Sequence, residues 1–69
     1  MLQFFEKSLE FLRCEITEQP SGRWRILITQ PSGYEWTEHF ASSETVHKRW
    51  RELQTRFIED GWLGPYGNE

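Results

Sequence analysis

Apolar and polar side chains alternate along residues 12–40, which is the pattern of an antiparallel sheet with one solvated face. Within this stretch Gln-Pro-Ser-Gly occurs twice, at residues 19–22 and again at 30–33. Proline suits the first position of a type I turn, and glycine accepts the left-handed conformation that closes a three-residue hairpin loop. The sequence therefore predicts a meander of three antiparallel strands joined by two tight hairpins.

The loop lengths also predict the register of the strands, because a slip of one residue would place apolar side chains opposite polar ones. The first loop sets Ile16 opposite Ile26, and the second sets Ile28 opposite Trp36. One face of the sheet is then apolar and forms the core. Its expected members are Leu12, Cys14, Ile16, Trp24, Ile26, Ile28, Tyr34, Trp36 and Phe40.

A helix is predicted over residues 43–60, where apolar side chains at positions 46, 50, 53 and 57 recur at helical spacing. Ser42 or Ser43 can cap its start, since a serine hydroxyl accepts a hydrogen bond from a free backbone N–H. Gly61 fits the left-handed residue that ends a helix, with Trp62 as the apolar partner beyond it. We expect this helix to pack on the apolar face of the sheet.

Residues 1–9 are harder to assign, because Leu2, Phe5 and Leu9 follow helical spacing whereas the residues after them alternate as a strand. We expect a short helix or arm there, and a C-terminal tail over residues 62–69. The expected fold is thus one α+β domain spanning the chain. Its core, over residues 10–61, is a three-stranded antiparallel meander packed against one C-terminal helix.

Composition limits the classes of function. The chain has 69 residues and a net charge of −3, which gives no overall attraction to phosphate backbones or anionic membranes. The one cysteine, Cys14, has no partner for an internal disulfide, so a reducing compartment, the cytoplasm, is expected. No apolar stretch approaches the length of a membrane span. We expect no membrane association.

Several apolar residues lie outside the stripes assigned to the core, and seven of them are candidates for contact with a partner. On a small domain such residues either cover the core or form a surface for a partner. The leading hypothesis is a non-enzymatic protein-interaction or regulatory module that uses them to bind a protein partner or a second copy as a homo-oligomer. They are Leu2, Phe4, Phe5, Leu9, Ile58, Trp62 and Leu63.

Nucleic-acid binding is the alternative, through Arg13, Arg23 and Arg25 on the polar face of the sheet. The layout of residues 11–60 has three strands, a Gly-x-Trp near the start of the second, an aromatic ending the third and a polar-capped helix. It resembles the plant ethylene-response type of DNA-binding domain, which reads the major groove with its sheet. The resemblance is topological and carries over no residue. Interspersed glutamates favour cross-strand charge pairing over phosphate binding.

No catalytic, cofactor-binding or metal-ligating set is predicted. His39 and His47 lack a suitably spaced third metal ligand, and Cys14 is expected to point into the core as a small hydrophobe. The basic run around Lys48 belongs to a helix face of alternating charges, where Lys48 and Arg56 are expected to be ion-paired.

Glu38 is the charged residue that breaks the alternation, because it falls on the apolar face of the third strand. An inward charge on an edge strand discourages pairing with another sheet. The other interpretation is an ion pair with Arg49 on the flank of the helix.

Overall fold

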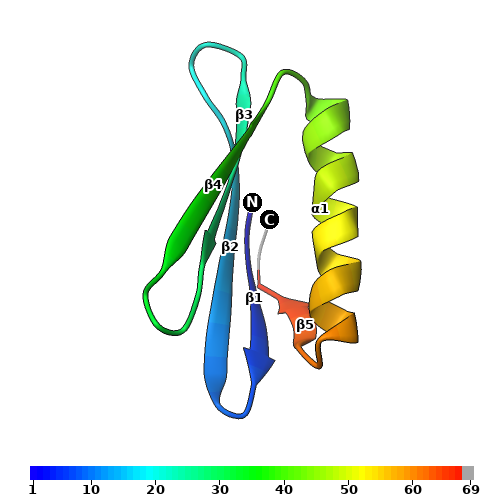
Figure 1. Cartoon of the computed structure of the whole chain (residues 1–69). Coiled ribbons are helices and arrows are strands. Elements are labelled where there is room, and N and C mark those ends of the chain that lie inside the picture. Colours follow the sequence, from blue (N-terminus) through cyan, green and yellow to red (C-terminus); the bar gives the residue numbers. More distant parts are fainter. Residues whose placement is uncertain (68–69) are drawn as a thin grey trace.

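The computed structural model describes residues 1–67, which form one antiparallel sheet of five strands and one helix (Figure 1). In chain order the elements are β1 (Leu2–Lys7), β2 (Glu10–Glu18), β3 (Trp24–Thr29), β4 (Glu35–Phe40), α1 (Ser43–Glu59) and β5 (Leu63–Tyr66).

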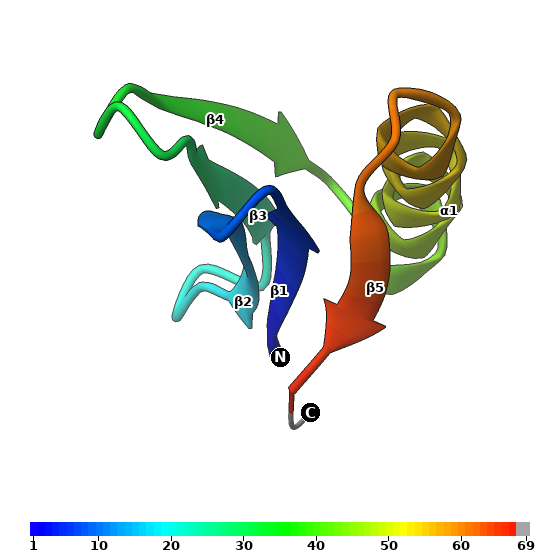
Figure 2. The ribbon, with the colours of Figure 1, turned by 90° about the horizontal axis from the view of Figure 1, so that it is seen from below.

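The strands lie side by side in the order β4-β3-β2-β1-β5. The first four form a meander, and β5 returns after the helix to pair with β1. Seen along the sheet, α1 covers one face, and no other element of the described residues covers the opposite face (Figure 2). The α+β class and the antiparallel sheet are therefore confirmed, but the sheet is larger than the three strands expected from the sequence.

Both Pro-Ser-Gly loops close as predicted. The N–H of Gln19 donates to the carbonyl of Arg23 at 2.7 Å, and that of Gln30 to Tyr34 at 2.8 Å. The glycine that ends each loop has a φ of +87° or +91°. Each paired residue on β2, β3 and β4 has the partner that the loop lengths predict, including Ile16 with Ile26 and Ile28 with Trp36.

The expected N-terminal helix or arm is wrong, because residues 2–7 form strand β1. β1 pairs with β2 across a two-residue turn, so Phe5 lies opposite Leu12 and points into the core. Alternate residues of β1 face the core, which is a strand period. The helical spacing of Leu2, Phe5 and Leu9 is coincidental, since Leu9 belongs to the turn.

The expected C-terminal tail is also wrong over residues 63–66, which form β5 beside β1. Phe4 pairs with Tyr66 and Glu6 with Leu63, with an irregularity between the two pairs. The free backbone groups on the second side of β1 supply the partner for this strand. Residues 68–69 of the expected tail lie outside the described residues.

The helix begins at the predicted residue, ends at Glu59, one residue before the predicted end, and has both predicted caps. The N–H of Thr45 donates to the hydroxyl of Ser42 at 3.2 Å. At the other end Gly61 takes a φ of +96°, and the N–H of Trp62 donates to the carbonyl of Phe57 at 2.9 Å, as in a Schellman motif. Within residues 1–67, no helix has the length and apolar character needed to cross a membrane.

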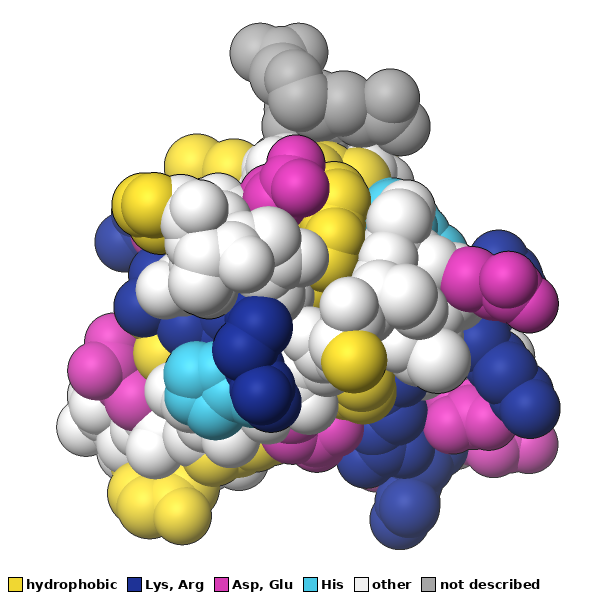
Figure 3. Space-filling model, turned by 90° about the horizontal axis from the view of Figure 1, so that it is seen from above, with side chains coloured by type: hydrophobic (Ala, Val, Ile, Leu, Met, Phe, Trp, Pro, Cys, Tyr) yellow, Lys and Arg dark blue, Asp and Glu magenta, His cyan; other side chains and the backbone are white. Residues whose placement is uncertain are grey.

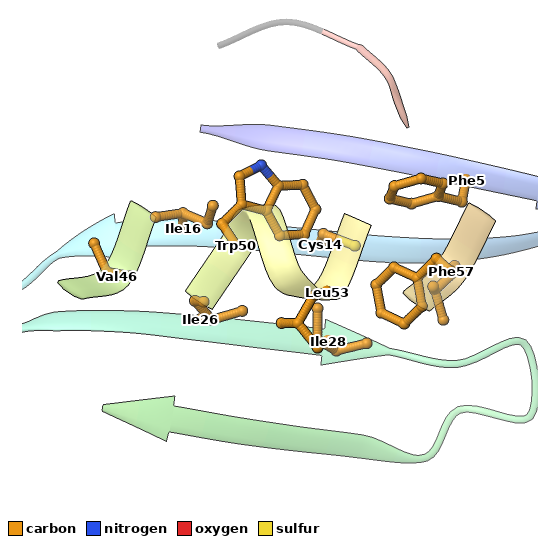
Figure 4. Packing of buried hydrophobic residues seen from close by; sticks show 10 residues of the cluster. Phe5, Cys14, Ile16, Ile26, Ile28, Val46, Trp50, Leu53 and Phe57 are labelled. Atoms are coloured by element: carbon orange, nitrogen blue, oxygen red, sulfur yellow. The ribbon is translucent and has the colours of Figure 1, made fainter. Parts of the chain in front are cut away.

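The core lies between α1 and the covered face of the sheet (Figure 4). Phe5 is fully buried there, with its ring centroid 6.1 Å from that of Trp50 and 5.2 Å from that of Phe57, both edge to face. The N-terminal strand thus completes the core under the second half of the helix. The buried apolar residues are Phe5, Leu12, Cys14, Ile16, Ile26, Ile28, Val46, Trp50, Leu53 and Phe57.

Candidate functional site

The face of the sheet opposite α1, called the outer face below, carries most of the exposed apolar side chains of the strands. Residues that lie opposite one another on neighbouring strands share a face. Glu6 therefore lies between Phe11 and Leu63, and Phe4 of the next row lies beside Tyr66. A third row places Leu2, Glu15 and Leu27 side by side.

The aromatic residues of the outer face gather on β1, β2 and β5. Phe11 is 59% exposed, Leu63 58% and Tyr66 55%, while Phe4 is half-buried. Contiguous exposed apolar surface of this kind marks an interaction site on a soluble domain, whereas single exposed apolar residues are ordinary. The apolar members of the outer face are Leu2, Phe4, Phe11, Leu27, Leu63 and Tyr66.

Charged residues are interspersed with these apolar ones. Arg13 and Glu15, neighbours on the same side of β2, form an ion pair of 2.6 Å. The strands place Glu6 and Glu35 on the same face and only one further arginine, Arg25. The outer face thus contains three carboxylates and two guanidinium groups, which gives it a slight negative charge. This balance does not attract a phosphate backbone.

The turn between β1 and β2 adds a strained and exposed leucine at one end of the outer face. Ser8 and Leu9 have φ values of +53° and +66°, a conformation that favours asparagine and glycine. Leu9 is 88% exposed, and its N–H donates to Glu6 at 3.2 Å. A left-handed conformation costs a non-glycine residue about 1–2 kcal/mol. Leu9 therefore carries a conformational penalty without the compensation of burial.

The structure brings together some of the seven residues predicted to contact a partner. Leu2, Phe4 and Leu63 lie on the outer face, and Leu9 lies on the adjoining turn. Phe5 is wrong as an interface residue, because it is fully buried against the helix.

The other two predicted contact residues lie on the helix side of the molecule. Trp62 is half-buried against the core, with Lys7 Nζ 5.2 Å from the centroid of its ring. Ile58 is 53% exposed on α1, the element that covers the opposite face. Neither belongs to the outer face.

Sequence reasoning missed three members of the outer face, namely Phe11, Leu27 and Tyr66. The signal for Phe11 and Leu27 was present, since they are the large apolar residues on the polar side of the predicted meander. Tyr66 is also an apolar residue outside the predicted stripes, but its place beside Phe4 depends on strand β5, which forms by pairing with β1.

The three arginines predicted to bind nucleic acid do not form one cluster. Arg13 lies opposite Thr29 on β3, and Arg25 lies four residues from Thr29 along that strand, about 13 Å away at the rise of a strand. Arg23 lies in the loop before β3. Figure 3 shows the molecule from above, at the end that carries the loop between β2 and β3, and basic and acidic side chains are interspersed on this surface.

The expected pairing of charges along the helix is wrong for Lys48 and Arg56, which make no ion pair within the described part of the chain. The predicted contact between Glu38 and Arg49 is confirmed. Arg49 Nε donates to Glu38 Oε1 at 2.8 Å, and Arg49 Nη2 to Oε2 at 3.1 Å. The hydrogen bonds and charge of Arg49 hold the pKa of the Glu38 carboxyl below its usual range.

The side chains considered for catalysis or metal binding lie apart. Cys14 is buried in the core as expected, and burial raises the pKa of its thiol to about 12, so the nucleophilic thiolate is scarce. Ring Nδ1 of His47 lies 2.7 Å from the carbonyl oxygen of Ser43 in the first turn of α1. Among residues 1–67, no group of three His, Cys, Asp or Glu side chains could hold a metal ion.

Two open grooves flank the helix on the covered side of the sheet. One, of about 750 Å³, lies between α1 and the loop before β4, with Leu53 and Phe57 among its lining residues. The other, of about 460 Å³, is lined by Trp24 and Trp50 among others. The larger groove carries Lys7, Arg49 and Arg56 but also Glu10 and Asp60, and Arg49 is paired with Glu38, so its charges select no particular ligand.

No family model, curated protein or solved structure matches the chain.

Proposed function

We propose that this chain is a non-enzymatic protein-interaction module whose binding surface is the outer face of the sheet. The observation that carries the proposal is the row of Phe11, Glu6 and Leu63, which continues into Phe4 and Tyr66 without a covering layer. Aromatic residues and arginine are the types most enriched at protein interfaces. Arg13 lies in the row with Phe4, so both types occur together.

The charges of the outer face suggest the chemistry of the partner. Glu6 lies between two exposed apolar side chains, and its free oxygen has no arginine or lysine opposite it on the neighbouring strands. Burial of a carboxylate at an interface is unfavourable unless a charged or hydrogen-bonding partner reaches it. The expected partner is a protein surface that is largely apolar and carries a basic side chain opposite Glu6.

Leu9 supports the same proposal independently. Glycine at this turn would avoid the conformational penalty, and a polar residue would avoid exposing an apolar side chain. A leucine in this place is accounted for if its side chain is buried by a partner. It extends the binding surface past the end of β1 and β2.

The non-enzymatic part of the proposal is supported by the placement of Cys14 within the core, away from any substrate. A single cysteine without a disulfide partner also fits a reducing compartment, and we propose a cytoplasmic location on this basis.

Nucleic-acid binding is a second candidate, favoured by one observation. Phe4, Phe11 and Tyr66 present aromatic rings on an open sheet face, and single-stranded nucleic acids bind by stacking bases on such rings. Arg13 and Arg25 lie on the same face. The excess of carboxylates and the pairing of Arg13 with Glu15 make this the weaker proposal.

The test is affinity capture from native lysate with three matched baits: the unchanged chain, Phe11→Asp and Ile58→Asp. Phe11 and Ile58 are exposed to 59% and 53%, so both variants are expected to fold. The proposal predicts a nuclease-resistant protein partner that Phe11→Asp loses and Ile58→Asp retains. Capture that disappears after nuclease treatment would instead favour the second candidate. Equal capture by all three baits would contradict both.

A further inference from the structure

The strand β4 is an edge of the sheet, and within residues 1–67 its second side faces no other element (Figure 2). The opposite edge, β5, has four residues, and Pro65 within it lacks a backbone N–H. β4 has six residues and no proline. An edge of this kind can pair with another strand through its free backbone groups. β4 is therefore the edge at which the sheet can be extended.

The hairpin loop determines which residues of β4 direct their backbone groups toward this free edge. The N–H of Gln30 donates to the carbonyl of Tyr34, so this closing pair is hydrogen-bonded. In an antiparallel ladder such pairs alternate with pairs whose N–H and C=O groups point away. Glu35, Thr37 and His39 therefore turn their backbone groups away from β3 and toward solvent.

We infer that the free edge of β4 pairs with β4 of a second copy of this chain, in an antiparallel and two-fold symmetric register centred on Thr37. In this register Glu35 of each copy lies opposite His39 of the other. Both side chains are exposed and lie on the outer face. An imidazole has an N–H donor in either protonation state, so each pair can form a hydrogen bond to the carboxylate.

Other symmetric registers lack this complementarity. Centring the pair on Glu35 or on Glu38 would place two glutamates directly opposite each other, and like charges in such positions are destabilising. Centring it on His39 would oppose two histidines, and centring it on Trp36 would leave Glu35 opposite Thr37 with no group of opposite charge. Charge complementarity therefore favours the register at Thr37.

The inward charge on β4 does not prevent this pairing. Glu38 is the kind of residue that discourages contact between sheet edges, but Arg49 holds both of its oxygens. Its charge is thus compensated within each copy. Pairing of the two β4 strands would form a continuous ten-stranded sheet in which the outer faces of the two copies adjoin. This assembly does not depend on the function proposed above.

The test is sedimentation equilibrium of the full chain over a wide range of concentration, with a charge exchange at the proposed contact. Glu35→Lys removes both Glu35–His39 pairs, and His39→Glu places glutamates opposite each other. Each single variant is expected to weaken the dimer about tenfold. The double variant Glu35→Lys/His39→Glu restores opposite charges and is expected to regain most of the affinity.

Thr37→Pro provides a second variant that acts on the backbone. The N–H of Thr37 points away from β3, so proline removes a donor from the free edge while the pairing with β3 is kept, as circular dichroism can verify. We expect this variant to be monomeric. A monomeric unchanged chain, a double variant no better than the single ones, or a dimer broken by Phe11→Asp but not by Thr37→Pro would overturn the inference.

Discussion

Arg49 and Glu38 form a two-pronged ion pair that joins the middle of α1 to the edge strand β4, with N–O distances of 2.8 and 3.1 Å. The pair compensates the charge of the Glu38 carboxylate, which points toward the helix side of the sheet at the flank of the core. It also connects the helix to β4, which is an edge strand of the described sheet.

Replacing Arg49 with methionine is expected to lower the free energy of unfolding at pH 7 by about 1 kcal/mol, because a partly exposed ion pair contributes modestly even with two hydrogen bonds. Arg49 lowers the pKa of Glu38 in the folded state. The contribution is therefore complete above the unfolded-state pKa of about 4.3 and is lost as the pH falls through the lower folded-state value.

Urea unfolding at pH 7 and at pH 3 measures this effect, with Arg51→Met as the control on the exposed side of the helix. The difference between Arg49→Met and the unchanged chain should shrink at pH 3. A difference that stays constant with pH would show that the charge of Glu38 does not contribute.

Phe5→Ala is expected to lower the free energy of unfolding by about 3–5 kcal/mol, because the ring is fully buried between Trp50 and Phe57 and its loss leaves a cavity. Phe11→Ala is the matched control, since Phe11 is a phenylalanine on the next strand that is 59% exposed. The control should change stability by less than about 1 kcal/mol. Equal losses from thermal or urea unfolding would contradict the assignment of Phe5 to the core and Phe11 to the surface.

Leu9→Gly is expected to raise the free energy of unfolding by about 0.5–1 kcal/mol. Glycine removes the cost of the left-handed conformation at this position, and the larger backbone entropy that glycine loses on folding offsets part of this gain. Gly22→Ala is the reverse control, because Gly22 has a φ of +87° and open space for a Cβ. It should lower stability. If Leu9→Gly is more stable and yet captures less partner, the strained leucine serves binding; a loss of stability would remove this interpretation.

Cys14 is expected to react with a thiol reagent far more slowly in the folded chain than in urea at pH 8, because burial raises the pKa of its thiol from 9.0 to about 12 and shields the sulfur from the reagent. The unfolded chain is the internal control, because it contains the same single thiol. The rate is followed with a thiol reagent that releases a coloured product when it reacts. Similar rates in the folded and unfolded chains would place Cys14 at the surface instead of in the core.

Sequence reasoning predicted the middle of the fold because its signals are local. The glycine of each Pro-Ser-Gly loop and the alternation beside it determine the register from β2 to β4, and Ser42 and Gly61 mark the limits of the helix. The two terminal strands lack such signals. The turn at Ser8 and Leu9 has neither glycine nor asparagine, and β5 contains Gly64 and Pro65, which ordinarily interrupt strands.

The candidate site was predicted only in part for the same reason. The sequence marks Leu2 and Leu63 as unassigned apolar residues, but their place on the same face as Phe11 depends on two strand pairings between residues distant in the sequence. The sequence predicts the terminal apolar residues and the arginines as two alternative surfaces. Pairing of β1 with β2 places Phe4 and Arg13 in one row.

The central claim, that the outer face binds a protein, is tested most directly by photo-crosslinking from defined positions. A photoreactive phenylalanine analogue is placed at Phe11 in one chain and at Ile58 in a matched chain, and both are irradiated in native lysate. The account predicts a discrete, nuclease-resistant protein adduct from position 11 that position 58 does not form. An adduct from position 58 alone, or none from position 11, would contradict it.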